Sequence, residues 1–196
     1  MKKLITLFLF IFSIHTSLIS DSSSNEIKRI VIGNENAKIS IIAYESLTCS
    51  HCANFHIDVL PDLKKEYIDT GIAKIEFRHF PLDVAAFNAS KIAQCKNDGN
   101  SEILNILYLN QSKWIKGGTI DEVNENLKKF LVSEGIQVDF EKCTNNKSIE
   151  DFVLNDRIEG VKKFKVNATP TIIINDKKFE KSLNYKNLKK TLEKLI

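Results

Sequence analysis

The chain has 196 residues, with 28 basic and 25 acidic side chains and a formal net charge of +3. Because its Lys-rich stretches are balanced by acids and are typical of a solvated face, the charge gives no argument for a nucleic-acid partner. The length is sufficient for one hydrophobic core with an inserted subdomain.

Residues 1–20 are predicted to be a secretory signal peptide. Lys2 and Lys3 form a positive start, and the apolar stretch Leu4–Ile14 is far shorter than the ~20 residues that span a membrane. Since no Ala-x-Ala cleavage motif follows, an uncleaved N-terminal anchor is the alternative. Residues 21–25 are predicted to be a polar linker. In either case we expect the domain to lie outside the cytoplasm, in the periplasm.

The first structured region predicts a βαβ unit. Strands are expected over 27–32, over the apolar run 38–44 and over 72–80, where apolar and polar residues alternate. Residues 53–68 carry apolar side chains at helical spacing and are expected to form a helix. The strands on either side of this helix should therefore be parallel, with a right-handed crossover.

The next region, from Asp83 to about Asn146, is predicted to be helical. Helices are expected over 84–96, over 102–116 with Ser101 as N-cap, and from Thr119, which begins a Thr-x-x-Glu capping box, to about Val132. A further helix is expected to begin at Ser148 and to end near Phe164. We interpret this all-helical segment as an insertion between two halves of a sheet domain.

The chain is predicted to return to strands after the insertion. Strands over 171–174 and 177–180 would form a hairpin around Asn175-Asp176, and an amphipathic helix is expected over 185–195. The element order βαβ, helical insertion, ββα predicts an α/β protein with a thioredoxin-like fold. Its predicted parts are 26–82 and 151–196, with the helical insertion at 83–150.

The tetrad Cys49-Ser50-His51-Cys52 stands where a predicted strand gives way to a predicted helix. A Cys-x-x-Cys at such a helix N-terminus is typical of a redox pair. The unpaired backbone N–H groups and the positive end of the helix dipole favour the thiolate of the first cysteine.

Three runs of residues resemble the DsbA-type thiol:disulfide oxidoreductases of bacterial envelopes, and most of all their alphaproteobacterial branch. They are Ser46–His56 around the cysteines, Phe77–Asp83, and Ala168-Thr169-Pro170-Thr171. The resemblance spans nearly the whole chain after the signal, in the same order and spacing. It implies the thioredoxin-like fold and a dithiol oxidase that introduces disulfide bonds into envelope or secreted proteins.

The resemblance also implies site residues. Cys49 would be the exposed nucleophile and Cys52 its buried resolving partner, with Ser50 and His51 tuning the pair. Thr169 and Pro170 would bind substrate peptide through the backbone next to a cis proline. No cofactor is implied.

The partners implied by the resemblance are reduced, unfolded or folding polypeptides and a membrane quinone-linked reoxidase of the DsbB type. Only the six residues 21–26 separate the predicted signal from the first predicted strand, which favours a monomer. Known isomerases of this class oligomerise through an N-terminal extension.

The sequence departs from the family in two places. Ser50 stands where the commonest family member has proline, so the redox potential is expected to differ. The family tends to place a buried acid six residues before the first cysteine, where this chain has Ala43. Glu45, two residues on, lies on the same face of a regular strand and is a candidate proton acceptor near Cys52. A surface Glu45 is the alternative.

Cys95 and Cys143 fall in the predicted insertion. Some family members resemble this chain in carrying a second, structural disulfide there, and an exported chain with an even number of cysteines favours pairing. Two buried free thiols are the alternative.

Competing functions are a disulfide isomerase or reductase on the same fold, and a redox-inactive peptide-binding module. A structural zinc site is disfavoured because no second clustered ligand pair accompanies Cys49 and Cys52. His56 is expected to be an exposed helix residue, although it stands one turn after Cys52. His79 is expected to be a strand residue and Trp114 a core residue.

Overall fold

The structure is a computed structural model that describes residues 26–196; the predicted signal peptide and linker, 1–20 and 21–25, lie outside the described residues. Five strands form one sheet: β1 (Ile30–Gly33), β2 (Ile39–Glu45), β3 (Ala73–His79), β4 (Thr171–Ile174) and β5 (Lys177–Lys178). Their order is β1-β3-β2-β4-β5. Only the β2–β3 pair is parallel, as the predicted βαβ unit requires.

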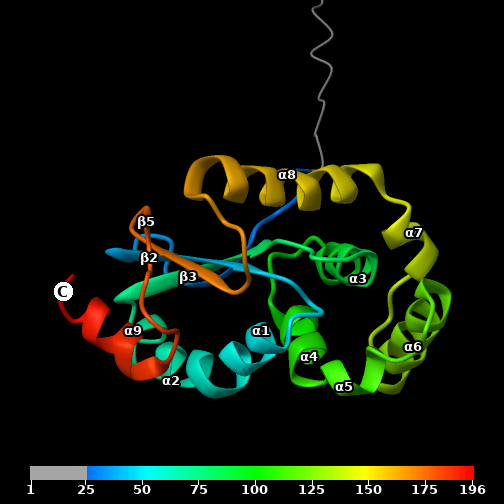
Figure 1. Cartoon of the computed structure of the whole chain (residues 1–196), viewed down its shortest axis with the longest axis horizontal. Coiled ribbons are helices and arrows are strands. Elements are labelled where there is room, and N and C mark those ends of the chain that lie inside the picture. Colours follow the sequence, from blue (N-terminus) through cyan, green and yellow to red (C-terminus); the bar gives the residue numbers. More distant parts are fainter. Residues whose placement is uncertain (1–25) are drawn as a thin grey trace, which may run out of the picture.

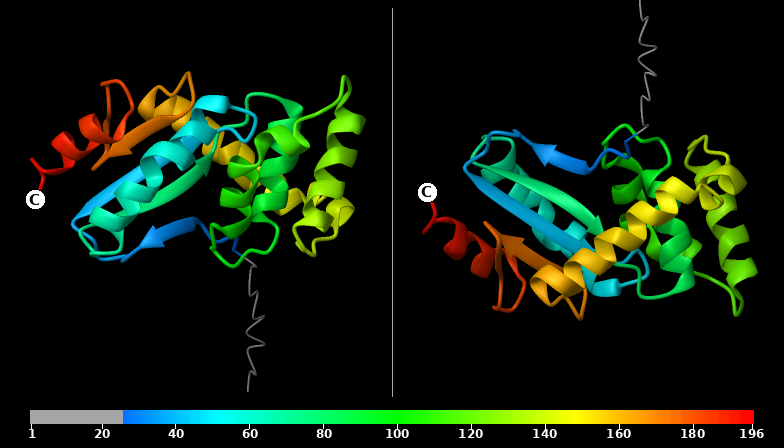
Figure 2. Two further views of the ribbon diagram at one scale, coloured as in Figure 1. Left: turned by 90° about the horizontal axis from the view of Figure 1, so that it is seen from below. Right: turned by 90° about the horizontal axis from the view of Figure 1, so that it is seen from above.

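Helices cover both faces of the sheet (Figures 1 and 2). On one face lie α1 (Ser50–Asn54), α2 (Leu60–Leu63) and α9 (Tyr185–Leu192), and on the other lies α8 (Lys147–Phe164). The central strands are therefore apolar on both sides: Ile41, Ala43 and Tyr44 of β2 are 0% exposed. The α/β class and the thioredoxin-like order of elements are confirmed.

The helix predicted over 53–68 is interrupted by two π-helical segments, η1 (Phe55–Val59) and η2 (Lys64–Ile68), which flank α2. Pro61 stands in the first turn of α2. Because proline has no N–H to donate to the preceding turn, the regular α-helical ladder cannot continue through it, and η1 ends just before it. The apolar residues keep their helical spacing through these segments, and Phe55, Val59 and Leu63 are all buried.

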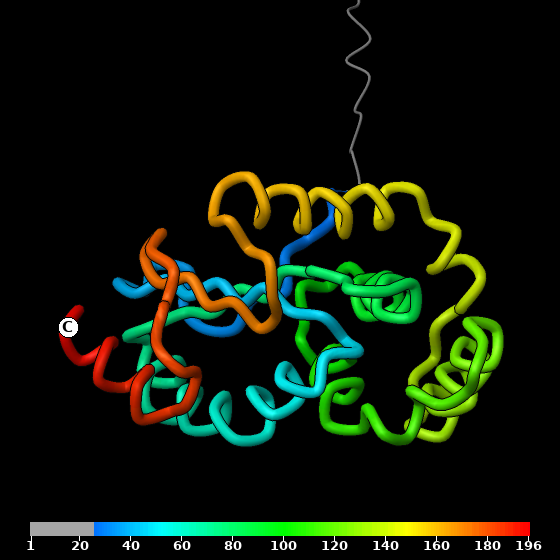
Figure 3. The backbone as a smooth tube through the Cα atoms, viewed as in Figure 1, coloured from blue at the N-terminus to red at the C-terminus, as the bar shows by residue number. Residues whose placement is uncertain are grey.

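The helical insertion leaves the sheet after β3 and returns through α8 (Figure 3). Its helices are α3 (Val84–Gln94), α4 (Glu102–Leu109), α5 (Gln111–Trp114), α6 (Ile120–Ser133) and α7 (Phe140–Thr144). The Thr119 capping box is present, and Trp114 is buried.

The prediction of one helix over 102–116 is wrong, because α4 and α5 are separate. The amide of Asn110 donates to the carbonyl of Ile106 at 2.9 Å, and such local side-chain bonds compete with a continuous helix. The side chain of Ser101 makes no capping bond. The helix expected to begin at Ser148 and to end near Phe164 is α8, which begins at Lys147 with Asn146 as its N-cap. It runs through the boundary predicted at residue 150. No helix within 26–196 is long and apolar enough to cross a membrane.

Candidate active site

The two cysteines of the tetrad lie at the carboxyl end of β2, where the chain turns into α1. Cys49 is the N-cap residue of α1, with extended backbone angles, and its carbonyl accepts from the N–H groups of Cys52 and Ala53 at 3.1 and 3.2 Å. Both cysteines are free thiols. Cys49 is half-buried, whereas Cys52 is 0% exposed. Only Cys49 is therefore open to attack by a large partner.

The surroundings of the two thiols shift their pKa values in opposite directions. A hydrogen bond from Cys52 lowers the pKa of Cys49 to about 5; burial opposes this, and the backbone N–H groups of Cys52 and His51 add to the lowering. Burial raises the pKa of Cys52 far above its usual range, and the nearby charge of Glu45 raises it further. At neutral pH Cys49 is a thiolate and Cys52 a thiol.

The segment that contains Thr169 and Pro170 faces the redox pair. The sulfur of Cys49 lies 3.3 Å from the carbonyl oxygen of Thr169, and the Thr169–Pro170 peptide bond is cis. Beside them is a pocket of about 470 Å³. It is lined by residues of the redox helix, which is the helical segment α1–η1 (50–59) that follows Cys49, and by residues of the Thr169–Pro170 turn and of the start of α9. Among them are His51, Phe55, Val59, Pro170 and Tyr185.

Ser50 and His51 have exposed side chains. Within residues 26–196 neither side chain makes a hydrogen bond to the sulfur of Cys49. The contribution of His51 to the acidity of Cys49 comes through its backbone N–H. A tuning role for the two side chains stays a prediction.

Glu45 is buried at the end of β2, with 3% of its surface exposed. Its Oε2 lies 2.9 Å from Nε2 of His56, while Oε1 has no hydrogen-bond partner among the described residues. Burial raises the pKa of this carboxyl, and the charge of His56 opposes the rise. Glu45 is thus an interior acid next to the redox pair rather than a surface residue.

The expectation that His56 is exposed is wrong, since only 4% of it is exposed. Its ring packs parallel to that of Tyr108 on α4, with 4.1 Å between centroids, and Nδ1 lies 3.0 Å from Oδ1 of Asn105. The helix face one turn after Cys52 points inward here because α4 of the insertion covers it. The position of His56 one helical turn after Cys52 was the feature of the sequence that could have indicated its burial.

Gln111 on α5 is a site residue that the sequence did not indicate. Its amide nitrogen donates to the carbonyls of Leu47 and Cys49, at 2.8 and 3.0 Å. Thr48 in the same loop donates to the carboxylate of Asp83 at 2.6 Å. Residues of the insertion thus hold the loop before the redox helix.

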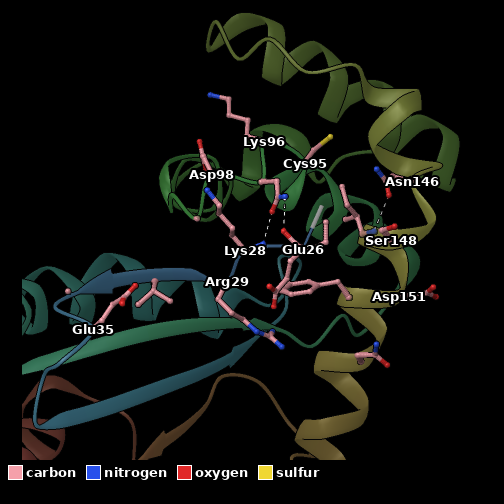
Figure 4. A pocket seen from close by; sticks show the side chains of 18 residues that line it. Glu26, Lys28, Arg29, Glu35, Cys95, Lys96, Asp98, Asn146, Ser148 and Asp151 are labelled. Atoms are coloured by element: carbon pink, nitrogen blue, oxygen red, sulfur yellow. Dashed lines mark hydrogen bonds between the residues drawn. The ribbon is translucent and has the colours of Figure 1, made fainter. Parts of the chain in front are cut away.

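Cys95 and Cys143 form a disulfide that joins α3 to α7, remote in sequence from the tetrad. Cys95 also borders a second pocket of about 1490 Å³, where Lys28, Arg29, Asp98 and Asn146 lie around it (Figure 4). None of the lining residues belongs to the redox pair or to the Thr169–Pro170 turn. This larger pocket is therefore separate from the redox chemistry.

The described part of the chain contains no group of three or more His, Cys, Asp or Glu side chains that could hold a metal ion. The chemistry that the site can perform with its own atoms is thiol–disulfide exchange: an accessible thiolate, a buried thiol and a peptide backbone beside them.

Comparisons with known proteins agree with this geometry. The family model described as thioredoxin matches residues 25–194. The crystal structure of Wolbachia pipientis alpha-DsbA1 is similar to this chain, with a TM-score of 0.75, 29% identity, and coverage of 85% of this chain and 90% of that one. Disulfide bond formation protein D of Bacillus subtilis is 25% identical over 174 residues, which are 84% of this chain and 75% of that protein.

A Rickettsia conorii protein, provisionally named a protein-disulfide oxidoreductase, is 30% identical over 149 residues. That match covers 74% of this chain and 53% of the Rickettsia protein. The matches to two further Rickettsia relatives cover 56% and 61% of the length of those proteins. The chain thus spans between about half and three fifths of the length of these relatives.

Proposed function

This chain belongs to the thioredoxin family and is a DsbA-type protein, and from that premise we propose that it is an exported thiol:disulfide oxidoreductase that introduces disulfide bonds into other proteins. The observation that carries the proposal is the contrast between the thiols of the Cys-Ser-His-Cys tetrad: Cys49 is accessible with a pKa of about 5, and Cys52 is fully buried with a raised pKa. A stabilised Cys49 thiolate favours the reduced protein, and so makes the disulfide form an oxidant.

The proposed reaction begins with the Cys49–Cys52 disulfide. A substrate thiolate attacks the sulfur of Cys49, the Cys49–Cys52 bond breaks, and Cys52 leaves with the electron pair and takes up a proton. A second substrate thiolate then attacks the substrate sulfur of the mixed disulfide. Cys49 leaves as a thiolate, which its low pKa favours, and the substrate carries away the new disulfide. The substrate has lost two electrons and the protein has gained them.

The substrates in this proposal are reduced, unfolded or folding polypeptides. The backbone of Thr169 lies beside Cys49 and precedes β4, which begins only at Thr171, so we assign to it the pairing with an extended peptide. The adjoining pocket of about 470 Å³ has apolar walls from Phe55, Val59 and Leu183. These features support a site that binds a short peptide segment with little sequence specificity.

The reduced protein must be reoxidised for a further cycle. We assign this step to a membrane quinone-linked partner of the DsbB type, and we place the protein in the periplasm as a monomer. Support for these assignments comes from the family and from the predicted signal peptide at residues 1–20.

The first test is the redox equilibrium of the Cys49–Cys52 pair with glutathione, measured in the Cys95→Ala/Cys143→Ala variant so that only one pair titrates. We expect a potential above about −180 mV, in the range of disulfide donors. A value near about −270 mV, the range of thioredoxin, indicates a reductase instead. Peptide binding without any thiol exchange in the wild-type protein indicates the redox-inactive binding module.

A further inference from the structure

The outer side of α8 carries an apolar stripe that is open to solvent among residues 26–196. Leu154, Ile158 and Val161 follow one another at helical spacing and are 37%, 46% and 46% exposed. No other helix of the described range has three large apolar side chains exposed to this extent. Single exposed apolar residues are ordinary on a protein surface, whereas a continuous stripe of them indicates a contact surface.

Lysines follow the stripe at the C-terminal end of α8. Lys162 lies one turn after Ile158, and Lys165 is the C-cap residue of the helix. Neither has an acidic partner among residues 26–196, and the ammonium group of Lys165 donates to the carbonyl of Lys162 at 3.2 Å. Lys163, between them, is paired with Asp176 at 3.1 Å. This end of the helix therefore presents two cations whose charge no carboxylate of the described chain neutralises.

All four acidic side chains of α8 do have a basic partner. The ion pairs join Glu150 and Asp151 to Lys147, Asp156 to Arg29, and Glu159 to Arg78. The charge that remains without a partner on this helix is therefore positive. It stands next to the apolar stripe, and this combination fits a partner with a negative surface and an apolar interior.

We propose that the outer side of α8 is a docking surface for a bilayer of anionic lipid. The apolar stripe enters the boundary between headgroups and acyl chains, and Lys162 and Lys165 contact the lipid phosphates. Helices that lie on membranes combine an apolar side with basic residues. Long lysine side chains keep their charge at the headgroups while their stems pass along apolar surface. Because α8 and α1 cover opposite faces of the sheet, the redox helix lies on the side away from the lipid (Figure 1).

The place where the described chain begins supports this orientation. Glu26 borders the same pocket as Asn146 and Ser148 at the start of α8 (Figure 4). Residues 1–25 are joined to the domain at this point. A retained N-terminal anchor would therefore hold α8 close to the bilayer.

The experiment reads the surroundings of α8 itself, because an N-terminal anchor alone would bind the full chain to vesicles. Trp114 is the single tryptophan and is buried, so the added emission of Ile158→Trp reports on the stripe. The full chain is mixed with vesicles of phosphatidylglycerol whose acyl chains carry bromine, which quenches tryptophan on contact. We expect the emission of Ile158→Trp to be quenched and shifted to shorter wavelength, and that of the wild type to stay unchanged. Brominated phosphatidylcholine should quench Ile158→Trp much less.

The contribution of the two lysines is measured by adding Lys162→Gln/Lys165→Gln to Ile158→Trp. Each lysine near an anionic surface contributes roughly fivefold to binding, so the ratio of docked to undocked α8, taken from the quenching, should fall by about thirtyfold. Salt should lower the same ratio in Ile158→Trp, because it screens exposed charges.

Val132→Trp is the matched control, because Val132 on α6 is the most exposed large apolar side chain of residues 26–196. Its emission should not respond to the vesicles. Absent quenching of Ile158→Trp, equal quenching of Val132→Trp, or equal quenching with and without the two lysines overturns the proposal. A blue shift of Ile158→Trp that grows with protein concentration without lipid overturns it as well, and indicates that the stripe binds a second copy of the chain.

Leu154→Trp serves as a second reporter on the same stripe, and the same outcomes apply to it if Ile158→Trp does not fold. Thiol exchange with glutathione is measured in every variant. The docking surface does not depend on the proposed function, so a lack of exchange in the wild type contradicts that function and leaves the lipid result unaffected.

Discussion

The amide nitrogen of Gln111 lies 3.0 Å from the carbonyl oxygen of Cys49, so that a side chain of the helical insertion holds the residue that begins the redox helix. The same nitrogen donates to the carbonyl of Leu47 at 2.8 Å. Gln111→Ala removes both bonds and leaves two carbonyls without this donor. We expect the free energy of unfolding to fall by about 1–2 kcal/mol, measured by urea denaturation. We also expect the pKa of Cys49 to rise as the loop loosens.

A matched control is Asn126→Ala, which removes an amide that donates to the carbonyl of Lys116 at 2.9 Å on the exposed side of the insertion. This change should leave the pKa of Cys49 as in the wild type. If Gln111→Ala changes neither the stability nor that pKa, the insertion does not support the redox loop through this side chain.

The low pKa of Cys49 predicts how the reduced protein responds to pH. A hydrogen bond from Cys52, opposed by burial, places that pKa at about 5, whereas a free thiol titrates near ~8.5. A thiolate stabilised by folding contributes stability that is fully present above the unfolded pKa and is lost as the pH falls through the folded one. The reduced protein should therefore lose stability relative to the oxidised protein between about pH 8.5 and pH 5.

The measurement is thiolate absorbance at 240 nm, with a midpoint expected near pH 5, together with denaturation of both redox forms across the same range. Cys49→Ser removes the titrating group and cannot form the redox disulfide, so its absorbance step should disappear, and it should lack the loss of stability between about pH 8.5 and pH 5 that is expected of the reduced wild type. A midpoint near that of a free thiol contradicts the assignment of Cys49 as the stabilised thiolate.

The position of the redox pair was predictable because its signals are local. The buried strand, the tetrad and the helix after it stand within 31 consecutive residues, 38–68. The contacts of Gln111 and Asn105 were not predictable, because each crosses from the insertion to a segment about 50 to 60 residues away in sequence. The break between α4 and α5 falls at Asn110, whose amide donates to the carbonyl of Ile106, and the apolar spacing of the sequence gives no indication of it.

The disulfide between Cys95 and Cys143 closes a segment with a sequence separation of 48 residues. Cross-linking a loop of that length restricts the unfolded chain, and its removal is expected to cost at most about 4 kcal/mol. The Cys95→Ala/Cys143→Ala variant should therefore unfold at a lower urea concentration than the wild type. Its exchange with glutathione through Cys49 and Cys52 should be unchanged, because this disulfide joins α3 to α7 and not the redox segments.

The control for this change is the wild-type protein with all disulfides reduced, compared with the form in which only Cys49 and Cys52 are reduced; it should be destabilised in the same direction while both thiols of the insertion are kept. Equal stability of the variant and the wild type, both with Cys49 and Cys52 reduced, would show that the insertion disulfide does not restrict the unfolded chain. A lost exchange activity in a folded variant would show that the insertion disulfide supports the redox site.

Gly160 on α8 lies against the ring of Tyr44 on β2, and a Cβ added at this glycine would be 2.8 Å from the ring. Two effects of Gly160→Ala compete. Alanine favours the helix by about 1 kcal/mol, whereas overpacking a core costs about 1–3 kcal/mol. The second should prevail, because Tyr44 is 0% exposed and Phe80 and Phe164 pack against its ring, so it has no room to move.

We therefore expect Gly160→Ala to lower the free energy of unfolding by about 1–2 kcal/mol in urea denaturation. The cause can be separated from helix propensity by the double variant Gly160→Ala/Tyr44→Leu, which gives the added methyl group space. If steric overlap is responsible, Gly160→Ala should destabilise the wild-type background but not the Tyr44→Leu background, where the propensity gain remains. A stabilising effect in both backgrounds would show that α8 can move away from the sheet without cost.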